Sequence, residues 1–162
     1  MPLKARIDAI PAHEADERTK RSNYPASFAR RVEGRVKRPL GDLFGLRNFG
    51  VNLTSLLPGA HSALQHRHSR QDELVYVLSG RPTLVVDDRT LELTPGMVAG
   101  FAAGTVAHHL ENRTTEMCVV LEVGDRTAGD EVAYPDDDLQ ARAAPGGGWI
   151  MAHKDGSPYD AT

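Results

Sequence analysis

The stretch of sequence from Gly59 to Gly80, GAHSALQHRHSRQDELVYVLSG, decides the fold predicted for this chain. Side chains of a β-strand point alternately to its two faces. In a strand, His66 and His68 therefore share one face and Arg67 takes the other. The four residues that follow are enough for a hairpin loop, which brings Glu73 back across from the two histidines. The stretch thus predicts two paired strands that hold two imidazoles and one carboxylate on the same face.

Glu73 is the residue that points to a metal ion. It is followed two and four residues later by valines, which share its face in a strand. A carboxylate among inward-facing valines is costly to bury unless it is paired, and a divalent cation is the strongest partner available. Asp72 directly precedes Glu73, so alternation places its carboxylate on the outer face. Neither His61 nor His153 is in register with this pattern, and both are expected outside the site.

A second histidine-rich stretch supplies a fourth ligand. Residues 104–112 read GTVAHHLEN, and alternation places His108 and Asn112 on one face and His109 on the other. We expect His108 to bind the metal, Asn112 to be a structural hydrogen-bonding residue, and His109 to contact either the surface or a ligand. Three neutral imidazoles and one carboxylate suit one divalent ion, which can be Fe, Mn, Ni, Co or Zn. Two octahedral positions remain for water or substrate.

The 162 residues suit one domain with two irregular ends. Residues 1–39 are polar and lack a sustained period, so we expect an N-terminal arm that packs on the barrel or on a partner, with at most a short helix near 12–21. Residues 40–125 consist of short apolar runs separated by turn-forming residues, which is typical of sandwiches and barrels. Residues 126–162 are rich in Gly, Asp and Pro and are expected to form a C-terminal tail, anchored at 149–151.

Eight short strands and no long helix are predicted in the central region. They cover residues 49–57, 64–68, 73–78, 83–86, 90–93, 97–101, 108–112 and 116–123. The prediction is an all-β fold, and two β-rich halves of similar length suit a jelly roll.

Composition argues against several classes of partner. The formal net charge is −3, and basic residues are scattered except for a short cluster between Arg30 and Arg38, so nucleic acid is not an expected partner. No apolar run approaches the roughly 20 residues of a membrane-spanning helix, and the first thirty residues contain no apolar signal segment. The one cysteine, Cys118, cannot form an internal disulfide. A cytoplasmic protein without a membrane partner is therefore expected.

The two histidine-rich stretches resemble the two sequence motifs of the cupin superfamily. The first, G-x5-H-x-H-x3,4-E-x6-G, appears as Gly59, His66, His68, Glu73 and Gly80, and the second, G-x5-P-x-G-x2-H-x3-N, as Gly96, Gly104, His108 and Asn112. One extra residue lies before His66 and another before His108, and Ala102 stands where the motif has proline. The resemblance covers about residues 40–123. It implies the cupin double-stranded β-helix, a jelly-roll barrel, and often a homodimer.

Three further segments are similar to a group of small bacterial single-domain cupins, some of which are labelled sugar-phosphate isomerases. The segments are residues 50–53, 72–78 and 153–159. The residue between the paired histidines is commonly aromatic in that group, whereas this chain has Arg67.

Three functions are compatible with such a metal site. The first is a metal-dependent isomerase of a small oxygenated substrate such as a sugar phosphate, in which a base moves a proton through an enediol. It needs cations for the phosphate, for which Arg70, Arg81 and Lys154 are candidates, and the sequence names no catalytic base. The second is an Fe(II)-dependent dioxygenase, and the third is a non-catalytic module that binds a sugar or another small molecule. We place the isomerase first.

Overall fold

The computed structural model describes residues 8–20 and 22–159, which form an all-β fold. The strands are β1 (Arg35–Pro39), β2 (Phe49–Leu56), β3 (Arg67–His68), β4 (Glu73–Ser79), β5 (Thr83–Val86), β6 (Arg89–Glu92), β7 (Val98–Phe101), β8 (His108–Glu111), β9 (Cys118–Asp125), β10 (Glu131–Tyr134), β11 (Leu139–Ala143) and β12 (Trp149–Ala152). The helical segments are η1 (Ala12–Glu14), α1 (Ala26–Ala29), η2 (Arg30–Val32) and α2 (Leu40–Leu43). None of the helices in this part of the chain is long and apolar enough to cross a membrane.

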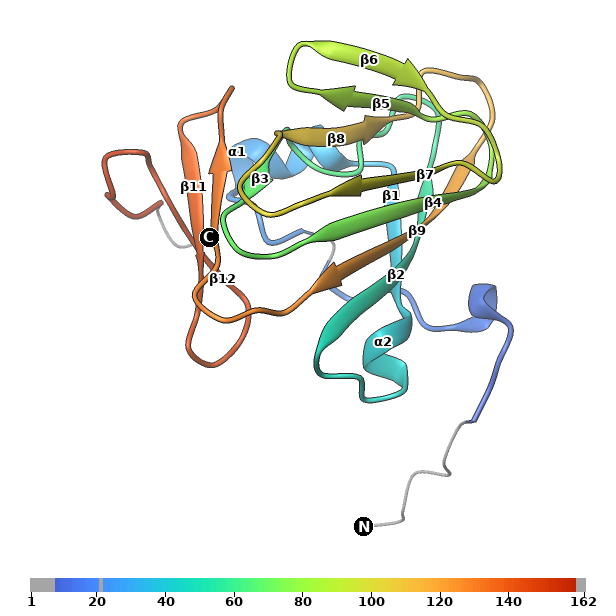
Figure 1. Ribbon diagram of the computed structural model, residues 1–162, viewed down its shortest axis with the longest axis horizontal. Coiled ribbons are helices and arrows are strands. Elements are labelled where there is room, and N and C mark those ends of the chain that lie inside the picture. Colours follow the sequence, from blue (N-terminus) through green and yellow to red (C-terminus); the bar gives the residue numbers. More distant parts are fainter. Residues whose placement is uncertain (1–7, 21, 160–162) are drawn as a thin grey trace.

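The strands form three antiparallel sheets, and in Figure 1 the C-terminal strands β11 and β12 stand at the left, beside the barrel. The strand orders of the three sheets are β1-β2-β9-β4-β7, β6-β5-β8 and β12-β11-β10-β3. The first two sheets share one buried core, to which they contribute Leu56, Val75, Val77, Leu84, Leu110 and Val120. This arrangement is the jelly-roll barrel that the sequence predicts.

Strand β4 illustrates how alternation builds the barrel. Val75 and Val77 are buried in the core, whereas Leu74 and Tyr76 point outward and are 41% and 40% exposed. Because side chains alternate along a strand, Glu73 lies on the inward face with the two valines. The inward face of β4 therefore changes from apolar to acidic at the end where the strand begins.

The C-terminal residues do not form the irregular tail expected from their composition. Strands β10, β11 and β12 make a sheet with β3, in which Val132 lies opposite His68. One face of this sheet is buried against the N-terminal segment in a second core of Leu64, Val132, Tyr134, Leu139 and Ala141, with Tyr24 and Phe28 packed on it. The alternation is present in the sequence, but each run has only four or five residues and is separated from the next by Gly, Asp and Pro.

The N-terminal segment is also more regular than an arm. All five residues of β1 pair with β2, from Arg35 opposite Leu56 to Pro39 opposite Asn52. The strand expected at 64–68 is shorter than predicted, since only Arg67 and His68 form a strand and His66 makes an isolated bridge to His108. The other seven expected strands are present, with ends shifted by at most two residues.

Candidate metal centre

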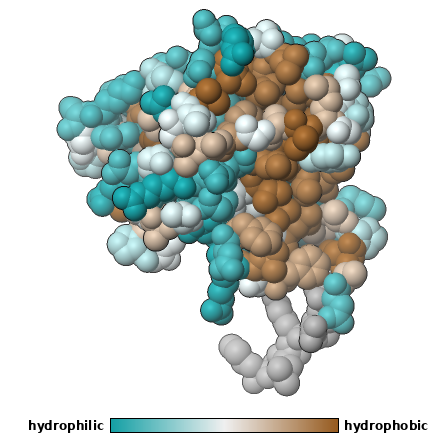
Figure 2. Space-filling model, viewed as in Figure 1, coloured by the Kyte–Doolittle hydropathy of each residue, from teal (hydrophilic) through white to brown (hydrophobic). Residues whose placement is uncertain are grey.

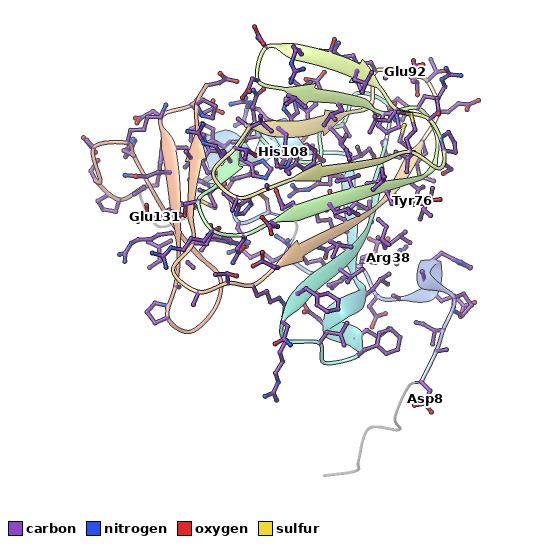
Figure 3. All side chains as sticks on the ribbon, viewed as in Figure 1. Asp8, Arg38, Tyr76, Glu92, His108 and Glu131 are labelled. Atoms are coloured by element: carbon purple, nitrogen blue, oxygen red, sulfur yellow. The ribbon has the colours of Figure 1, made fainter. Side chains whose placement is uncertain are left out.

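The four predicted metal ligands meet where the three sheets approach one another. His68 lies in β3, Glu73 begins β4, and His108 begins β8, where Figure 3 labels it. His66 is held against His108 by reciprocal main-chain hydrogen bonds of 3.2 and 2.9 Å. The side chains of the three histidines are 8 to 12% exposed. The structure thus brings together four residues that are separated by as many as 42 positions in the sequence.

One oxygen of Glu73 is the centre of this cluster. Its Oε2 atom lies 2.9 Å from Nε2 of His108, 3.2 Å from Nε2 of His66 and 3.5 Å from Nε2 of His68. Ligand atoms bound at about 2.1 Å to one ion in neighbouring positions are about 3 Å apart. The distances from Glu73 to the three imidazoles are thus those of neighbouring ligands of one divalent ion, and ligand atoms of His66, His68 and Glu73 also lie within 4.8 Å of one another.

Two of the three remaining ring nitrogens support the same interpretation, whereas Nδ1 of His108 is buried without a hydrogen-bond partner in the described part of the chain. Nδ1 of His66 is 2.8 Å from the carbonyl oxygen of Leu64, and Nδ1 of His68 is 2.6 Å from Oδ2 of Asp130. Both oxygens can accept a hydrogen bond from Nδ1–H, which leaves Nε2 as the nitrogen available to a metal. Metal-binding histidines are typically oriented in this way by a carbonyl or a carboxylate.

The charges of the cluster compensate one another. Burial by itself would raise the pKa of Glu73, but hydrogen bonds from His108, His66 and His68 hold this pKa well below its ordinary value. Burial lowers the pKa of His108. Burial would also lower the pKa of His68, yet Glu73 and Asp130 raise it to about 9. Without a metal, His68 therefore carries the proton that balances the carboxylate.

Asp130 is a residue of the candidate site that the sequence analysis missed. It is 1% exposed, and its Oδ1 accepts hydrogen bonds from the Ser69 hydroxyl and from the main-chain N–H groups of Arg70 and Gln71. Its Oδ2 faces His68. Asp130 thereby fixes both the histidine ring and the loop that connects β3 to β4. It precedes β10, in the region expected to be a tail, and no periodic pattern marks it.

Aromatic side chains enclose the cluster. Phe101 stacks on His108 with ring centroids 3.5 Å apart and nearly parallel planes. Trp149 meets the edge of His68 at 5.8 Å, and Tyr134 lies 6.2 Å from His66. Two of these three aromatics come from the C-terminal sheet, which therefore forms one wall of the site.

The cluster opens into a cavity of about 1030 Å³ that is lined by three further carboxylates, those of Asp42, Glu122 and Asp125. Glu122 lies opposite Val75 on β9 and faces inward like Glu73, which lies opposite Gly124. Such diagonal neighbours in an antiparallel pair have Cα atoms roughly 7–8 Å apart. Oε2 of Glu122 is 2.7 Å from Nζ of Lys37 and accepts a hydrogen bond of 3.0 Å from the Thr54 hydroxyl.

The cations in this cavity are not those that the sequence suggested. Arg18, Arg35, Lys37 and Arg126 line it. Burial lowers the pKa of Arg35, and the positive charge of Arg18 lowers it further. Arg126 is paired with Asp42 at 2.7 Å.

The suggested cations Arg70, Arg81 and Lys154 are absent from the described lining of this cavity. Arg81 pairs with Glu92 at 2.7 Å, on exposed side chains. Lys154 instead lines a separate cavity of about 680 Å³ on the outer face of the C-terminal sheet. Lys154 was a candidate only because the C-terminal sheet, which separates it from the larger cavity, was not predicted from the sequence.

The other predicted residues lie as alternation places them. Asn112 is 1% exposed and donates hydrogen bonds to the carbonyl oxygens of Leu56 and Glu116, so its role is structural. His109 lies on the face of β8 opposite His108, with Glu111. His153 is outside the cluster and contacts Asp138 at 2.8 Å.

A signal for Glu122 was present in the sequence. Cys118, Val120 and Glu122 alternate on one face of the predicted strand, and the first two are fully buried. A carboxylate at the third inward position of such a strand must face the barrel interior. Lys37 and Arg35 carried no comparable signal, because β1 was not predicted.

Comparisons with known proteins agree with this architecture. The model of the cupin domain matches residues 52–124. A sugar phosphate isomerase from a cupin superfamily of Silicibacter pomeroyi is 37% identical, with a TM-score of 0.86 over 94% of this chain and 97% of that chain. An Acidithiobacillus ferrooxidans protein, named as a candidate sugar phosphate isomerase, is 30% identical, with a TM-score of 0.70 over 86% and 96% of the two chains.

A more distant structure shares the fold alone. The polyketide cyclase RemF of Streptomyces resistomycificus is 20% identical, with a TM-score of 0.60 over 74% of this chain and 79% of that chain. No curated protein matches the sequence.

Proposed function

Because this chain belongs to the cupin superfamily, and because its histidine cluster shares a cavity with the carboxylate of Glu122, we propose that it is a metal-dependent isomerase. The proposed reaction interconverts an aldose phosphate and a ketose phosphate. The names of the two structures at 37% and 30% identity favour this substrate class. The observation that carries the proposal is the position of Glu122 beside the cluster.

The four clustered residues would hold the metal. A divalent ion bound by His66, His68, Glu73 and His108 would supply Lewis-acid polarisation of the substrate carbonyl. The stacked ring of Phe101 fixes the plane of His108, and Asp130 fixes the ring of His68. The residues of the chain thereby determine the orientation in which a carbonyl and its neighbouring hydroxyl can bind.

Glu122 is the group we assign to proton transfer. The contacts of Lys37 and Thr54 both fall on its Oε2 atom, so Oε1 is the oxygen we assign to the substrate. In the forward direction it removes the proton from the carbon next to the carbonyl and returns it to the carbonyl carbon. The hydroxyl proton moves to the former carbonyl oxygen, and the atoms of substrate and product balance without a co-substrate.

The phosphate is assigned to two guanidinium groups that line the cavity, those of Arg18 and Arg35. Arg18 and Arg35 repel each other, and a bound phosphate dianion would offset both positive charges. Guanidinium groups bind phosphate in a bidentate geometry. Arg18 holds the carbonyl oxygen of Lys20 through Nε, and Arg35 holds that of Ser62 through Nη1, so the main chain positions both groups.

Solvent exchange tests the isomerase directly. Untagged protein reconstituted separately with Fe(II), Mn(II), Co(II), Ni(II) and Zn(II) is incubated in D₂O with aldose phosphates of three to six carbons, and deuterium at C1 of the ketose is measured by NMR. Glu122→Gln is expected to lower turnover by about 10²–10⁴-fold, the usual contribution of a general base, at unchanged metal content. Glu92→Gln, on an exposed carboxylate outside the cavity, is the matched control.

The outcomes separate the competing functions. Absence of deuterium incorporation with every metal and sugar phosphate would contradict the proposal. Oxygen uptake by the Fe(II) form would then favour the dioxygenase. Ligand binding without either reaction would favour the non-catalytic module.

A further inference from the structure

A second cluster of metal-binding side chains lies on the outer face of β8. His109 and Glu111 are two residues apart on this strand and point away from the barrel interior that His108 faces. His61, from the segment before β3, lies directly opposite Glu111 in an isolated bridge. None of these three residues belongs to the cluster around Glu73.

The three side chains converge closely. Nε2 of His109 is 2.9 Å from Oε1 of Glu111. The rings of His61 and His109 are stacked, with centroids 5.5 Å apart and an interplanar angle of 25°. One ligand atom from each of the three residues lies within 4.8 Å of the others. Small side-chain rotations are enough to bring three such atoms to bonding distance of one ion.

The main chain holds this geometry in place. On one side of the bridge, Ser62 N–H donates to the carbonyl oxygen of Leu110, and Leu110 N–H donates to the Ser62 hydroxyl, both at 2.8 Å. On the other side, Asn112 and the segment at Gly59 and Ala60 exchange hydrogen bonds of 2.8 and 2.9 Å. His61 therefore cannot drift away from β8 without breaking the pairing around it.

The carboxylate of Glu111 is held by a neighbouring side chain, as metal-binding carboxylates usually are. Nε of Arg113 lies 2.6 Å from Oε2 of Glu111, which leaves Oε1 directed at His109. His109 is 8% exposed, whereas His61 is only partly buried and provides access from solvent. Two imidazoles and one carboxylate are the donors that Zn(II), Co(II), Ni(II) and Cu(II) accept. Three protein ligands also leave at least one position open.

We propose that His61, His109 and Glu111 form a second binding site for a divalent transition metal ion, on the side of β8 opposite the first cluster. The chain would then carry two ions on opposite faces of one strand. This site is distinct from that of the proposed isomerase, because only His66, His68 and His108 contact Glu73, although His109 also lines the larger cavity. Its ion would fasten the segment before β3 to β8, and hence the segment that carries His66 and His68.

The test is the stoichiometry of zinc. Untagged protein is stripped with a chelator and titrated with Zn²⁺ by calorimetry, and the wild-type chain is expected to bind two ions. His61→Ala and Glu111→Gln are each expected to bind one, with affinity at the outer site reduced by more than about 100-fold, since even the loss of a supporting contact costs 10–100-fold. His109 is left unchanged because it adjoins His108.

Two further variants make the result specific. His153→Ala removes another histidine that contacts a carboxylate, through Asp138, and should keep both ions. The double variant His66→Ala/Glu73→Ala removes the inner cluster and should still bind one ion, whose anomalous X-ray signal should lie between His61 and His109. Binding of no ion by this folded double variant, or equal stoichiometry of wild type and His61→Ala, would overturn the proposal. If the inner cluster does not bind zinc but the outer site does, the wild-type chain will bind one ion and His61→Ala will bind none.

Discussion

Asp130 is the residue that contacts Nδ1 of His68 and so orients its ring toward the cluster. Substitution Asp130→Asn keeps the size of the side chain but can place an amide N–H opposite Nδ1 of His68. The imidazole would then keep its proton on Nε2, the nitrogen that must bind the metal. We expect metal affinity to fall by 10–100-fold, measured by competition with a chelator.

The surface offers a matched control for that substitution. Asp138 contacts Nδ1 of His153 at 2.8 Å, much as Asp130 contacts His68, but its side chain is 63% exposed. Asp138→Asn should leave metal affinity unchanged. Equal affinity in wild type and Asp130→Asn would show that Glu73 and packing orient His68 without help.

The proton on His68 makes metal binding dependent on pH. Without metal, the pKa of His68 is about 9, so at neutral pH the ion must displace this proton. Metal affinity should therefore rise with pH, by up to tenfold per unit from neutrality to about pH 9, and level off above it. Proton release of close to one per ion at pH 7, measured by calorimetry in buffers of different ionisation enthalpy, is the expected result. A pH-independent affinity across this range would contradict it.

For single residues, the sequence predicted which side chains converge. The alternation of side chains along a strand and the short loop after His68 determine the face on which each of these side chains lies. His66, His68 and Glu73 follow from those two facts alone. Asp130 does not, since it lies 62 positions after His68 and reaches it only when β10 pairs with β3. Contacts between elements that are distant in sequence carry no local pattern.

Gly80, which follows the end of β4, is required both for its backbone conformation and for the lack of space around it. Gly80 has a φ of +76°, and an added Cβ would lie 2.7 Å from Cα of Cys118 and 2.8 Å from the carbonyl oxygen of Met117. Gly59 has a similar φ of +82° but nothing within 4 Å of an added Cβ. The two positions therefore separate backbone strain from steric overlap.

We expect Gly59→Ala to reduce the free energy of unfolding by about 1–2 kcal/mol, the cost of a left-handed conformation. Gly80→Ala should cost roughly 1–3 kcal/mol more, because main-chain atoms of the β9 region must shift to accommodate the methyl group. Urea denaturation of both variants measures the difference. If the two substitutions reduce the free energy of unfolding equally, the main chain of β4 and β9 accommodates the methyl group without further loss of stability.

The elements themselves were predictable where their apolar runs are long enough to show a period. Strand β5 was predicted at its observed bounds, and β4 within one residue. Strands β10 and β11 were missed because each has only two buried alternate residues, such as Val132 and Tyr134. Their stability comes from packing on Tyr24 and Phe28, which local sequence does not reveal.

At the scale of the whole molecule, one face of the large sheet is apolar and exposed. Figure 2 shows this apolar surface as a broad brown area that crosses the region of β4 and β9. The outward residues of these strands are Leu74, Tyr76, Leu78, Val119, Leu121 and Val123. Large contiguous apolar patches typically mark interaction sites.

We propose that a second copy of the chain covers this face. The outward residues of β4 and the central part of β9 carry no charge, so two copies can pair about a twofold axis without repulsion. Tyr76→Glu, at the residue labelled in Figure 3, should convert a dimer into a monomer in light scattering after size exclusion. Leu91→Glu is the control, because Leu91 is 55% exposed but lies on β6 in the other sheet. A wild-type monomer would contradict the proposal.

The link between Asp130 and His68 also constrains the order of events during synthesis. All four residues of the inner cluster leave the ribosome before Asp130, which is made 22 positions after His108. Until β10 has paired with β3, the ring of His68 has no partner to select its tautomer. A nascent chain would therefore hold an ion at the proposed site weakly and would release it readily. The choice of metal would become final only when the last quarter of the chain has folded onto the barrel.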